Sequence, residues 1–395
     1  MSQKIVISIN TAWNIYNFRS GLIKALMSHG YQVVAVAPGD EYADRLKDLG
    51  CRFINIPMDN NGTHPGRDLS LLMRYIRVLR SERPLAYLGY TVKPNVYGSL
   101  AAHMLRIPVI NNIAGLGTTF INSSFLTHIV RTLYRVSLRR SRRIFFQNAD
   151  DQALFIRTGL VMPEKTDRLP GSGMDLTRFQ PVQSLPLPGR PFVFLLVSRM
   201  LKDKGVEEFV EAARLVQKQH PSIRFQLLGF VDEANSNSIP LERLKGWENE
   251  GIIRYLGKTD DVRPHLAQAD CIVLPSYREG VPRSLLEAAA MGRPIIATNV
   301  VGCRDVVDDN VNGLLCRPKD ARDLADKMTQ MINFSPERRL EMGRAGRQKV
   351  ETEFDEKLVI QKYLNTIADI ATAKARSGTG REAMLAMRSK SARKP

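Results

Sequence analysis

Short apolar runs alternate with segments of helical spacing along almost the whole chain. In the first half the runs cover residues 4–9, 32–37, 52–56, 85–88, 109–112 and 144–147. In the second half they cover residues 192–197, 223–228, 252–255, 271–274, 295–297 and 314–316. Helices are predicted between them, among others at 18–29 and at 68–80, where Asp68 is the expected N-cap. Strands that alternate with helices predict an α/β fold of doubly wound parallel sheets.

The length of the chain predicts two domains. Its 395 residues exceed what one ordinary core needs, since domains of about 100–200 residues are the rule. Four prolines between positions 178 and 191 predict a semi-rigid linker. We therefore expect a Rossmann-like domain at 1–177, a linker at 178–191 and a second Rossmann-like domain at 192–353. Such domains bind ligands beside the carboxyl ends of their strands, in a cleft if the two domains face each other.

The charge of the chain is strongly positive and unevenly distributed. The formal net charge of +17 implies an anionic partner, such as a membrane, a nucleic acid or a phosphorylated substrate. No acidic residue occurs between Glu82 and Asp150. The tail at 377–395 is basic and lacks an apolar pattern, so we expect it to be disordered or to lie on a surface.

Cysteine spacing and hydropathy indicate a cytoplasmic protein. Cys51, Cys271, Cys303 and Cys316 have no CxxC or metal-finger spacing, and we expect buried thiols in a reducing compartment. The first residues are too strand-like for a signal peptide. No run of about 18 apolar residues predicts a membrane span.

Two glutamates eight residues apart indicate a ligand site. Glu279 lies in the loop after the run at 271–274, and Glu287 lies in a helix that is predicted to begin at Pro282. Carboxylates can accept hydrogen bonds from sugar hydroxyls, whereas without a ligand they would only complement the helix dipole. A helix N-terminus can also hold a phosphate, here through the N–H groups of Ser284, Leu285 and Leu286.

Two cations follow the apolar run at 192–197. Arg199 can bind a phosphate through its planar fork, and Lys204 can do so as a point charge. Without a ligand they would be solvated residues with ordinary salt bridges. Gly229 and Phe230 end the run at 223–228, and this glycine suits either a close approach to a planar base or a plain turn.

These motifs resemble glycosyltransferase family 4 in their order and spacing. The pattern is Ser-Arg-x5-Gly, then Leu-Gly, then Glu-Gly-Val-Pro-x4-Glu, within residues 190–350. The resemblance implies the GT-B fold, with a helix at 354–372 that crosses back to the first domain. It implies retaining, metal-independent transfer of a sugar from a nucleotide sugar. It also implies Arg199 and Lys204 at the diphosphate, Glu287 at the ribose, and Glu279 at the transferred sugar beside Gly280, Val281 and Pro282.

Three segments of the first half, at residues 10–19, 90–98 and 111–117, resemble a group within this family that extends undecaprenyl-diphosphate-linked saccharides. This resemblance implies a UDP-sugar donor, with UDP-N-acetylhexosamine favoured, and a polyprenyl-diphosphate-linked glycan acceptor in bacterial surface glycan or N-glycan assembly. The chain departs from many family members because its first strand–helix loop has no glycine before Gly21. The residues expected near the acceptor or the phosphate are Asn10, Thr11, Asn14, Asn17, Arg19, Thr91, Lys93, Asn112, Gly115 and Gly117.

The chain offers no evident metal site for the diphosphate. No Asp-x-Asp pair occurs, and no histidine has a partner at metal or triad spacing, so we expect no metal and no cofactor. Charge on the leaving nucleotide would then be stabilised by Arg199, Lys204 and helix N–H groups. We expect Glu279 to position the sugar and stabilise charge rather than act as a nucleophile.

Residues 125–143 form a basic amphipathic helix. Such a helix can lie on an anionic membrane surface, and the expected partner is the inner face of the cytoplasmic membrane. The alternative is an ordinary domain helix that buries one stripe. The residues that follow helical spacing are Leu126, Ile129, Val130, Leu133 and Ser137, and the expected membrane contacts are Arg131, Arg135, Arg139, Arg140, Arg142 and Arg143.

Two other functions compete with a glycosyltransferase. A nucleotide-sugar 2-epimerase or a phosphorylase could share the fold, but acid–base residues for the former and a pyridoxal lysine for the latter are not evident. A nucleic-acid-binding protein would explain the positive charge. It would need aromatic stacking platforms or a groove-reading motif, which the sequence does not show, and we expect no nucleic-acid partner.

Overall fold

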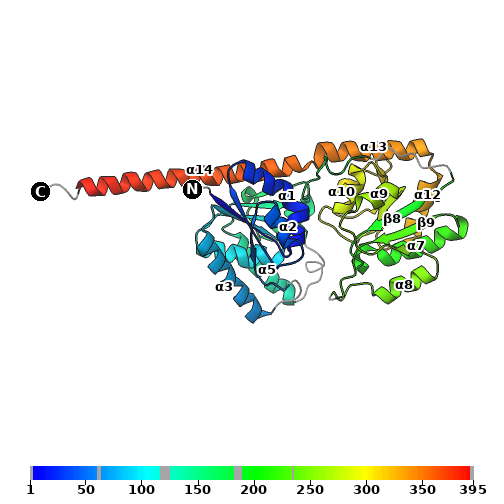
Figure 1. The fold of residues 1–395 in the computed structure, drawn as a ribbon, viewed down its shortest axis with the longest axis horizontal. Coiled ribbons are helices and arrows are strands. Elements are labelled where there is room, and N and C mark those ends of the chain that lie inside the picture. Colours follow the sequence, from blue (N-terminus) through cyan, green and yellow to red (C-terminus); the bar gives the residue numbers. More distant parts are fainter. Residues whose placement is uncertain (1–2, 60–63, 116–124, 182–188, 234, 392–395) are drawn as a thin grey trace.

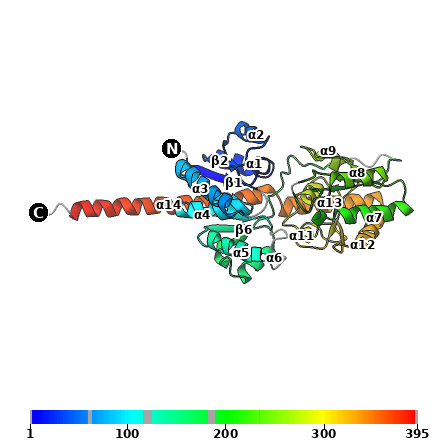
Figure 2. The ribbon, with the colours of Figure 1, turned by 90° about the horizontal axis from the view of Figure 1, so that it is seen from below.

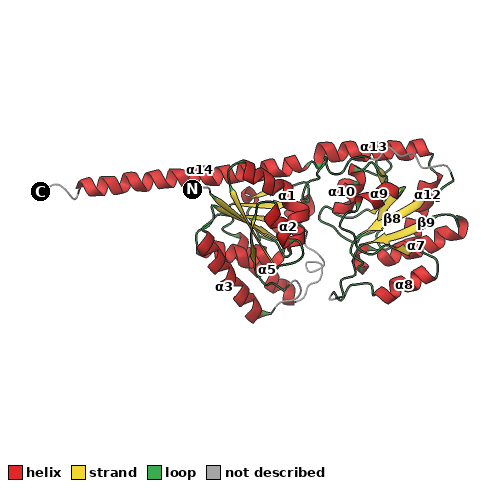
Figure 3. Ribbon diagram, in the orientation of Figure 1, coloured by secondary structure: helices red, strands yellow, loops and turns green. Residues whose placement is uncertain are grey.

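The chain folds into two parallel-sheet domains that lie side by side (Figure 1). The computed structural model describes residues 3–59, 64–115, 125–181, 189–233 and 235–391. Helices α13 (Pro336–Glu353) and α14 (Glu356–Ser391) run along one side of the molecule and span both domains. Colouring by secondary structure separates the two strand layers from the helices around them (Figure 3). The predicted α/β fold of two Rossmann-like domains is confirmed.

The first domain contains a seven-stranded sheet in the order β3-β2-β1-β4-β5-β6-β7. Every pairing in it is parallel. The order reverses beside β1, which makes the ends of β1 and β4 the switch point where open α/β sheets bind ligands. The strands are β1 (Lys4–Ser8), β2 (Gln32–Ala37), β3 (Arg52–Asn55), β4 (Ala86–Tyr90), β5 (Val109–Ile113), β6 (Arg143–Phe146) and β7 (Thr166–Arg168).

Helices cover both faces of this sheet. Apolar side chains of α1 (Ala12–Ser28), α2 (Ala43–Asp48) and α14 pack on one face in a common core. The other face packs against α3 (Pro65–Glu82) and α4 (Ser99–Met104), and α5 (Phe125–Leu138) follows in the same layer. Figure 2 shows α3, α4 and α5 in sequence across this side. Right-handed crossovers explain the arrangement, because the connections on the two sides of β1 run in opposite directions.

The second domain has a six-stranded parallel sheet in the order β10-β9-β8-β11-β12-β13. Its strands are β8 (Val193–Val197), β9 (Arg224–Leu228), β10 (Arg254–Tyr255), β11 (Cys271–Leu274), β12 (Ile295–Thr298) and β13 (Gly313–Cys316). Its helices are α7 (Val206–Gln219), α8 (Leu241–Asn249), α9 (Arg263–Gln268), α10 (Arg283–Ala290), α11 (Cys303–Val306) and α12 (Ala321–Asn333). The four cysteines are buried and unbridged, as predicted.

Several boundaries differ from the prediction. Helix α1 begins at Ala12, six residues early, because the hydroxyl of Thr11 accepts a hydrogen bond from the Asn14 N–H at 3.1 Å and caps it. Helix α3 begins at Pro65, since proline suits the first helical turn. Asp68 therefore lies inside this helix. Strand β7 and helix α6 (Ala149–Arg157) were not predicted.

The C-terminal segment crosses between the domains at residues 354–356. The Met174 N–H donates to the Phe354 carbonyl at 2.7 Å, and the Glu356 N–H donates to the Met174 carbonyl at 3.0 Å. Helix α14 then packs Val359, Tyr363 and Ile367 into the core of the first domain. Its backbone stays helical to Ser391 and projects beyond that domain (Figure 2), in the segment where the sequence predicts a tail that is disordered or lies on a surface. Alanine, methionine and arginine favour a helix even without an apolar stripe.

Candidate active site

Loops from the carboxyl ends of both sheets meet around Gly280. An added Cβ on Gly280, in the loop after β11, would overlap the carbonyl oxygen of Ala114 after β5. Asn148, after β6, donates from Nδ2 to the Gly280 carbonyl at 3.4 Å. The Glu279–Val281 loop therefore lies at the domain interface, and the absence of a side chain at Gly280 permits this approach.

Three ion pairs cross between the domains in the described part of the chain, one of them the exposed pair of Arg45 and Asp260 at 3.2 Å. Arg278 donates to Asp151, whose carboxylate is fully buried at the start of α6. Asn148 caps that helix and also contacts the same carboxylate at 3.0 Å. The third pair joins Arg304 and Asp150 at 3.0 Å and is largely exposed. The buried pair thus fixes the residue that directly precedes Glu279.

Lys204 and Glu279 come together across two loops of the second domain. The Lys204 Nζ lies 2.6 Å from Glu279 Oε1, and the Ser276 hydroxyl donates to the same oxygen at 2.7 Å. Both charged side chains are mostly buried, with 18% and 13% of their surface exposed. A tight backbone bond from the Tyr277 N–H to the Asp203 carbonyl, 2.9 Å long, holds the two loops side by side. A cation and a carboxylate are therefore preorganised at one point of the interface.

Glu287 lies one turn into α10 and is paired with Arg283. The Arg283 Nε is 3.1 Å from Glu287 Oε1, and only 12% of the glutamate side chain is exposed. Burial raises the pKa of Glu287, and the charge of Arg283 opposes that shift. Arg283 also reaches the first domain, where it donates to the Gly173 carbonyl at 2.6 Å and lies over the Phe18 ring. Arg283 thereby connects Glu287 to the opposite domain.

The N-terminus of α10 differs by one residue from the prediction. Pro282 is the extended N-cap, and its carbonyl accepts from the Leu285 N–H at 3.2 Å and the Leu286 N–H at 3.3 Å. The prediction that these two N–H groups are free was therefore wrong. Ser284 keeps its place in the first turn, and within the described residues its N–H and that of Arg283 have no acceptor. These two groups are the ones that can receive an anion.

Arg199 lies apart from the Lys204–Glu279 pair. It is half exposed, and its nearest acidic partner is Asp232 at 3.7 Å, in the loop after β9. The same loop carries Gly229 and the exposed Phe230. An added Cβ on Gly229 would overlap the Ser198 carbonyl, so this glycine is required for packing of the two loops.

Most of the predicted acceptor-side residues form hydrogen bonds or ion pairs within the first domain or cap its helices. Thr11 caps α1, with Asn14 in its first turn, and Asn17 donates to the Trp13 carbonyl at 3.0 Å. Lys93 is paired with Asp68 at 2.8 Å, and Thr91 has a left-handed φ of 56°. Asn112 donates to the Tyr363 hydroxyl at 3.1 Å. Gly117 lies outside the described residues.

Three of these residues retain features of a ligand site. Gly115 has a φ of 140°, and an added Cβ on it would lie 3.4 Å from the Gly280 nitrogen. Arg19 is buried under the Tyr90 ring, 4.4 Å from its centroid, and its Nε has no partner among the described residues. Asn10 Oδ1 is likewise buried without a partner in that part of the chain. These buried polar atoms near the ends of β1 and β4 can form hydrogen bonds with a polar ligand.

Helix α5 has features of both alternatives for the basic segment, which are a membrane contact and an ordinary domain helix. Tyr134, Ser137 and Leu138 are buried, so one stripe packs on the domain. The side chains of Leu126 and Ile129 lie outside the described part of the structure. Arg135, Arg139, Arg140 and Arg142 are exposed, whereas Arg131 and Arg143 are partly buried.

Comparison with known proteins supports the family resemblance. Residues 191–333 match the family described as "Glycosyl transferases group 1", and residues 18–171 match the "Glycosyl transferase 4-like domain". The N,N'-diacetylbacillosaminyl-diphospho-undecaprenol alpha-1,3-N-acetylgalactosaminyltransferase of Campylobacter jejuni is 30% identical over 367 residues, which is 89% of this chain and 94% of that protein. The chain belongs to the group 1 glycosyltransferases. It is therefore an enzyme, and the predicted family is confirmed.

Two further comparisons show similarity of this glycosyltransferase to one protein in sequence and to another in fold. The UDP-Gal:alpha-D-GlcNAc-diphosphoundecaprenol alpha-1,3-galactosyltransferase of Escherichia coli is 24% identical over 265 residues, covering 64% of this chain and 68% of that protein. The crystal structure of Anabaena Alr3699/HepE in complex with UDP-glucose has a TM-score of 0.74 at 18% identity, covering 93% of this chain and 99% of that one. The latter similarity shows that the glycosyltransferase shares the fold of that structure.

Sequence reasoning did not identify the interdomain partners in this glycosyltransferase. Asp151 and Arg278 are 127 positions apart, so no local pattern joins them. Arg283 follows Pro282 directly, and its spacing of four from Glu287 on a helix could have indicated the pair. Within the described residues no group of three or more His, Cys, Asp or Glu side chains could hold a metal ion. No helix in that part of the chain is long and apolar enough to cross a membrane.

Proposed function

We propose that this enzyme transfers a sugar, with N-acetylhexosamine favoured, from a UDP-sugar to a polyprenyl-diphosphate-linked saccharide in bacterial surface glycan or N-glycan assembly. The names of the Campylobacter and Escherichia relatives support the undecaprenyl-diphosphate acceptor. The name of the latter also supports a UDP-linked donor. The observation that carries the proposal in this chain is the Lys204–Glu279 contact of 2.6 Å beside the domain interface.

The donor is proposed to lie between α10 and the loop after β8. The diphosphate would be bound by Lys204, by Arg199 once its side chain turns from Asp232, and by the free N–H groups of Arg283 and Ser284. Glu287 would accept hydrogen bonds from the ribose hydroxyls. Binding of the phosphate would draw Lys204 from Glu279 and free that carboxylate for the transferred sugar.

The transfer is proposed to retain the anomeric configuration. The bond between the sugar C1 and the diphosphate oxygen breaks while the acceptor hydroxyl oxygen bonds to C1 on the same face. The acceptor proton passes to the departing phosphate oxygen, so no protein base is needed. Lys204 and Arg199 stabilise the negative charge that develops on the UDP, and preorganised groups of this kind are the main source of catalysis in such steps.

The membrane contact is proposed to involve the helix layer of α3, α4 and α5. Large apolar side chains are exposed on this layer, namely Leu69, Met73, Met104 and Val136. The same layer carries the exposed arginines of α5 and its C-terminal turn, namely Arg135, Arg139, Arg140 and Arg142. Basic charge beside exposed apolar groups favours an anionic lipid surface, where the lipid-linked acceptor would reside.

A donor panel with a lipid-linked acceptor tests the proposed reaction. The enzyme is offered UDP-N-acetylglucosamine, UDP-N-acetylgalactosamine, UDP-glucose and UDP-galactose with an undecaprenyl-diphosphate-linked monosaccharide. We expect one UDP-sugar to add a single residue, detected as a mass increase, with the anomeric configuration of the donor in the product. Inversion would contradict the proposed mechanism, and absence of transfer from every UDP-sugar would contradict the proposed donor class.

A further inference from the structure

A basic pocket lies at the edge of the first sheet that is opposite the candidate active site. It has a volume of about 610 Å³, and its lining residues precede the strands: Pro84 before β4, Pro108 before β5 and Arg142 before β6. The loops of the active site follow the carboxyl ends of strands in the same sheet. The length of the strands therefore separates the two sites, and the pocket is not part of the donor site.

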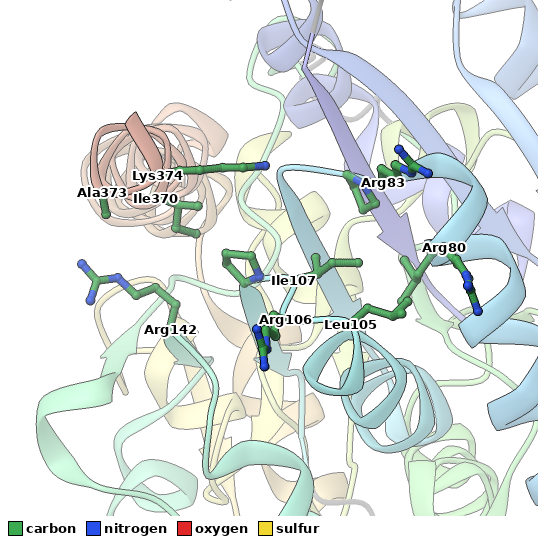
Figure 4. Close-up of a pocket in the computed structure, with 12 residues that line it drawn as sticks. Arg80, Arg83, Leu105, Arg106, Ile107, Arg142, Ile370, Ala373 and Lys374 are labelled. Carbon is green, nitrogen blue, oxygen red and sulfur yellow. The ribbon is translucent and has the colours of Figure 1, made fainter. Parts of the chain in front are cut away.

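Every charged residue that lines the pocket is a cation. Arg80, Arg83, Arg106 and Arg142 lie along its rim with their guanidinium groups turned outward, and Lys374 extends toward it from α14 (Figure 4). All five side chains are exposed. None of the four arginine side chains has an ion pair or hydrogen bond within the described residues. Their positive charge is therefore available to an external anion.

The nearest acidic residue in the sequence does not neutralise this pocket. Glu82 is buried, and its carboxylate oxygens are held by Lys4 at 2.9 Å and by Arg52 at 3.0 Å. The next acidic residue along the chain is Asp150, which is paired with Arg304 at the domain interface. The segment between Glu82 and Asp150 thus supplies cations without counter-charges, and the acidic residue of α14 next to the pocket is the exposed Asp369.

Two of the arginines occupy backbone positions where arginine is disfavoured. Arg83, which ends α3, has a φ of 47°, and Arg106, after α4, has a φ of 56°. Glycine or asparagine adopts this left-handed conformation at lower cost. The chain therefore carries guanidinium groups at two turns that glycine would suit better, and both turns line the pocket.

The interior of the pocket is apolar. Leu79 lines it from α3. Leu105 and Ile107, which follow α4, and Ile370 of α14 also line it (Figure 4). A phosphate group alone would occupy only part of a cavity of about 610 Å³. A ligand that combines a phosphate with an apolar substituent would match both the cations and the apolar walls.

We propose that this pocket binds a phosphate ester with an apolar substituent. The guanidinium groups bind its phosphate, and Leu105, Ile107 and Ile370 contact the apolar part. A phospholipid headgroup and a free phosphorylated compound share this chemistry, and the experiment below distinguishes them. The site is independent of glycosyl transfer, so its test does not depend on the reaction proposed above.

The test compares an Arg83→Asn/Arg106→Asn variant with the wild type. Asparagine tolerates the left-handed backbone and removes the charge. The matched control is Arg254→Asn/Arg344→Gln, which removes from the second domain two exposed arginines whose side chains have no ion pair or hydrogen bond within the described residues. Binding is measured by flotation with vesicles of equal parts phosphatidylcholine and phosphatidylglycerol, with pure phosphatidylcholine as reference. Calorimetry with inorganic pyrophosphate and with soluble dihexanoyl phosphatidic acid measures binding of free anions.

We expect the pocket variant to bind the phosphatidylglycerol vesicles about 30-fold more weakly than the control variant does. Each basic side chain near an anionic lipid surface raises the binding constant about fivefold, and the variant lacks two of them. A loss limited to the vesicles identifies a membrane headgroup, and a loss with the soluble phosphates identifies a free compound. Equal binding of the two variants in every arm would overturn the proposal. Thermal unfolding of both variants verifies that the first domain stays folded.

Discussion

At the scale of single residues, Lys204 is the cation closest to the proposed reaction. Its Nζ contacts Glu279 at 2.6 Å. We expect Lys204→Ala to lower kcat about 10²–10³-fold, as removal of one preorganised charge-stabilising group typically does. The measurement is the steady-state rate of transfer. The control is Lys202→Ala, which removes an exposed lysine from the same loop and should retain wild-type turnover. Near-normal turnover of Lys204→Ala would reject its role.

Glu287 provides a pH-dependent test at the same scale. Burial raises its pKa, so its contribution to stability is full below the unfolded-state pKa of about 4.3 and declines as pH rises through the folded-state value. The ionised carboxylate is the stronger acceptor for ribose hydroxyls. We therefore expect UDP affinity to fall as pH decreases through that raised pKa.

Glu287→Gln isolates this effect. The variant should bind UDP more weakly at neutral pH and should lose the part of the pH dependence that Glu287 causes. Its stability to urea should also rise relative to wild type as pH increases. The measurements are calorimetric Kd values and urea unfolding curves over the same pH range. Identical pH profiles for the two proteins would contradict the assignment.

At the scale of elements, the loop after β11 depends on Gly280. A methyl group there would overlap the Ala114 carbonyl across the interface, so Gly280→Ala must displace the loop or the domain. We expect transfer to fall by about 10²-fold, since a misplacement near 1 Å can have that effect. The control is Gly246→Ala in α8, where an added Cβ meets nothing within 4 Å. That change should stabilise the protein by about 1 kcal/mol without altering turnover.

Helices and strands with a strong local hydrophobic pattern were predicted from the sequence, and those without one were missed. The buried strands of both sheets are continuous apolar runs, so their positions were predicted from the sequence. Strand β7 is the polar triplet Thr166–Arg168 and exists because it pairs with β6, a signal that no local pattern contains. The two-glutamate loop was predicted from its motif. The buried ion pair of Lys93 and Asp68 was not predicted, because it depends on how α3 packs against the first sheet.

At the scale of the whole molecule, the buried Arg278–Asp151 pair joins the two domains. Removal of one partner of a buried pair leaves an unpaired charge, and we expect Asp151→Asn to lower the free energy of unfolding by roughly 3–5 kcal/mol. The exposed pair of Arg304 and Asp150 is the control, and Asp150→Asn should change stability by at most about 1 kcal/mol. Urea unfolding measures both. Equal effects of the two substitutions would show that the buried pair has no special role.

The central claim is that protein cations, and no divalent metal, bind the diphosphate of a uridine nucleotide between the loops of the second domain. Calorimetric titration of UDP in the presence of EDTA tests it most directly, with the wild type and an Arg199→Ala/Lys204→Ala variant. The account predicts that the wild type binds UDP equally well with and without EDTA and that the variant loses most of this affinity. Binding that requires a divalent cation, or that survives in the variant, would contradict it.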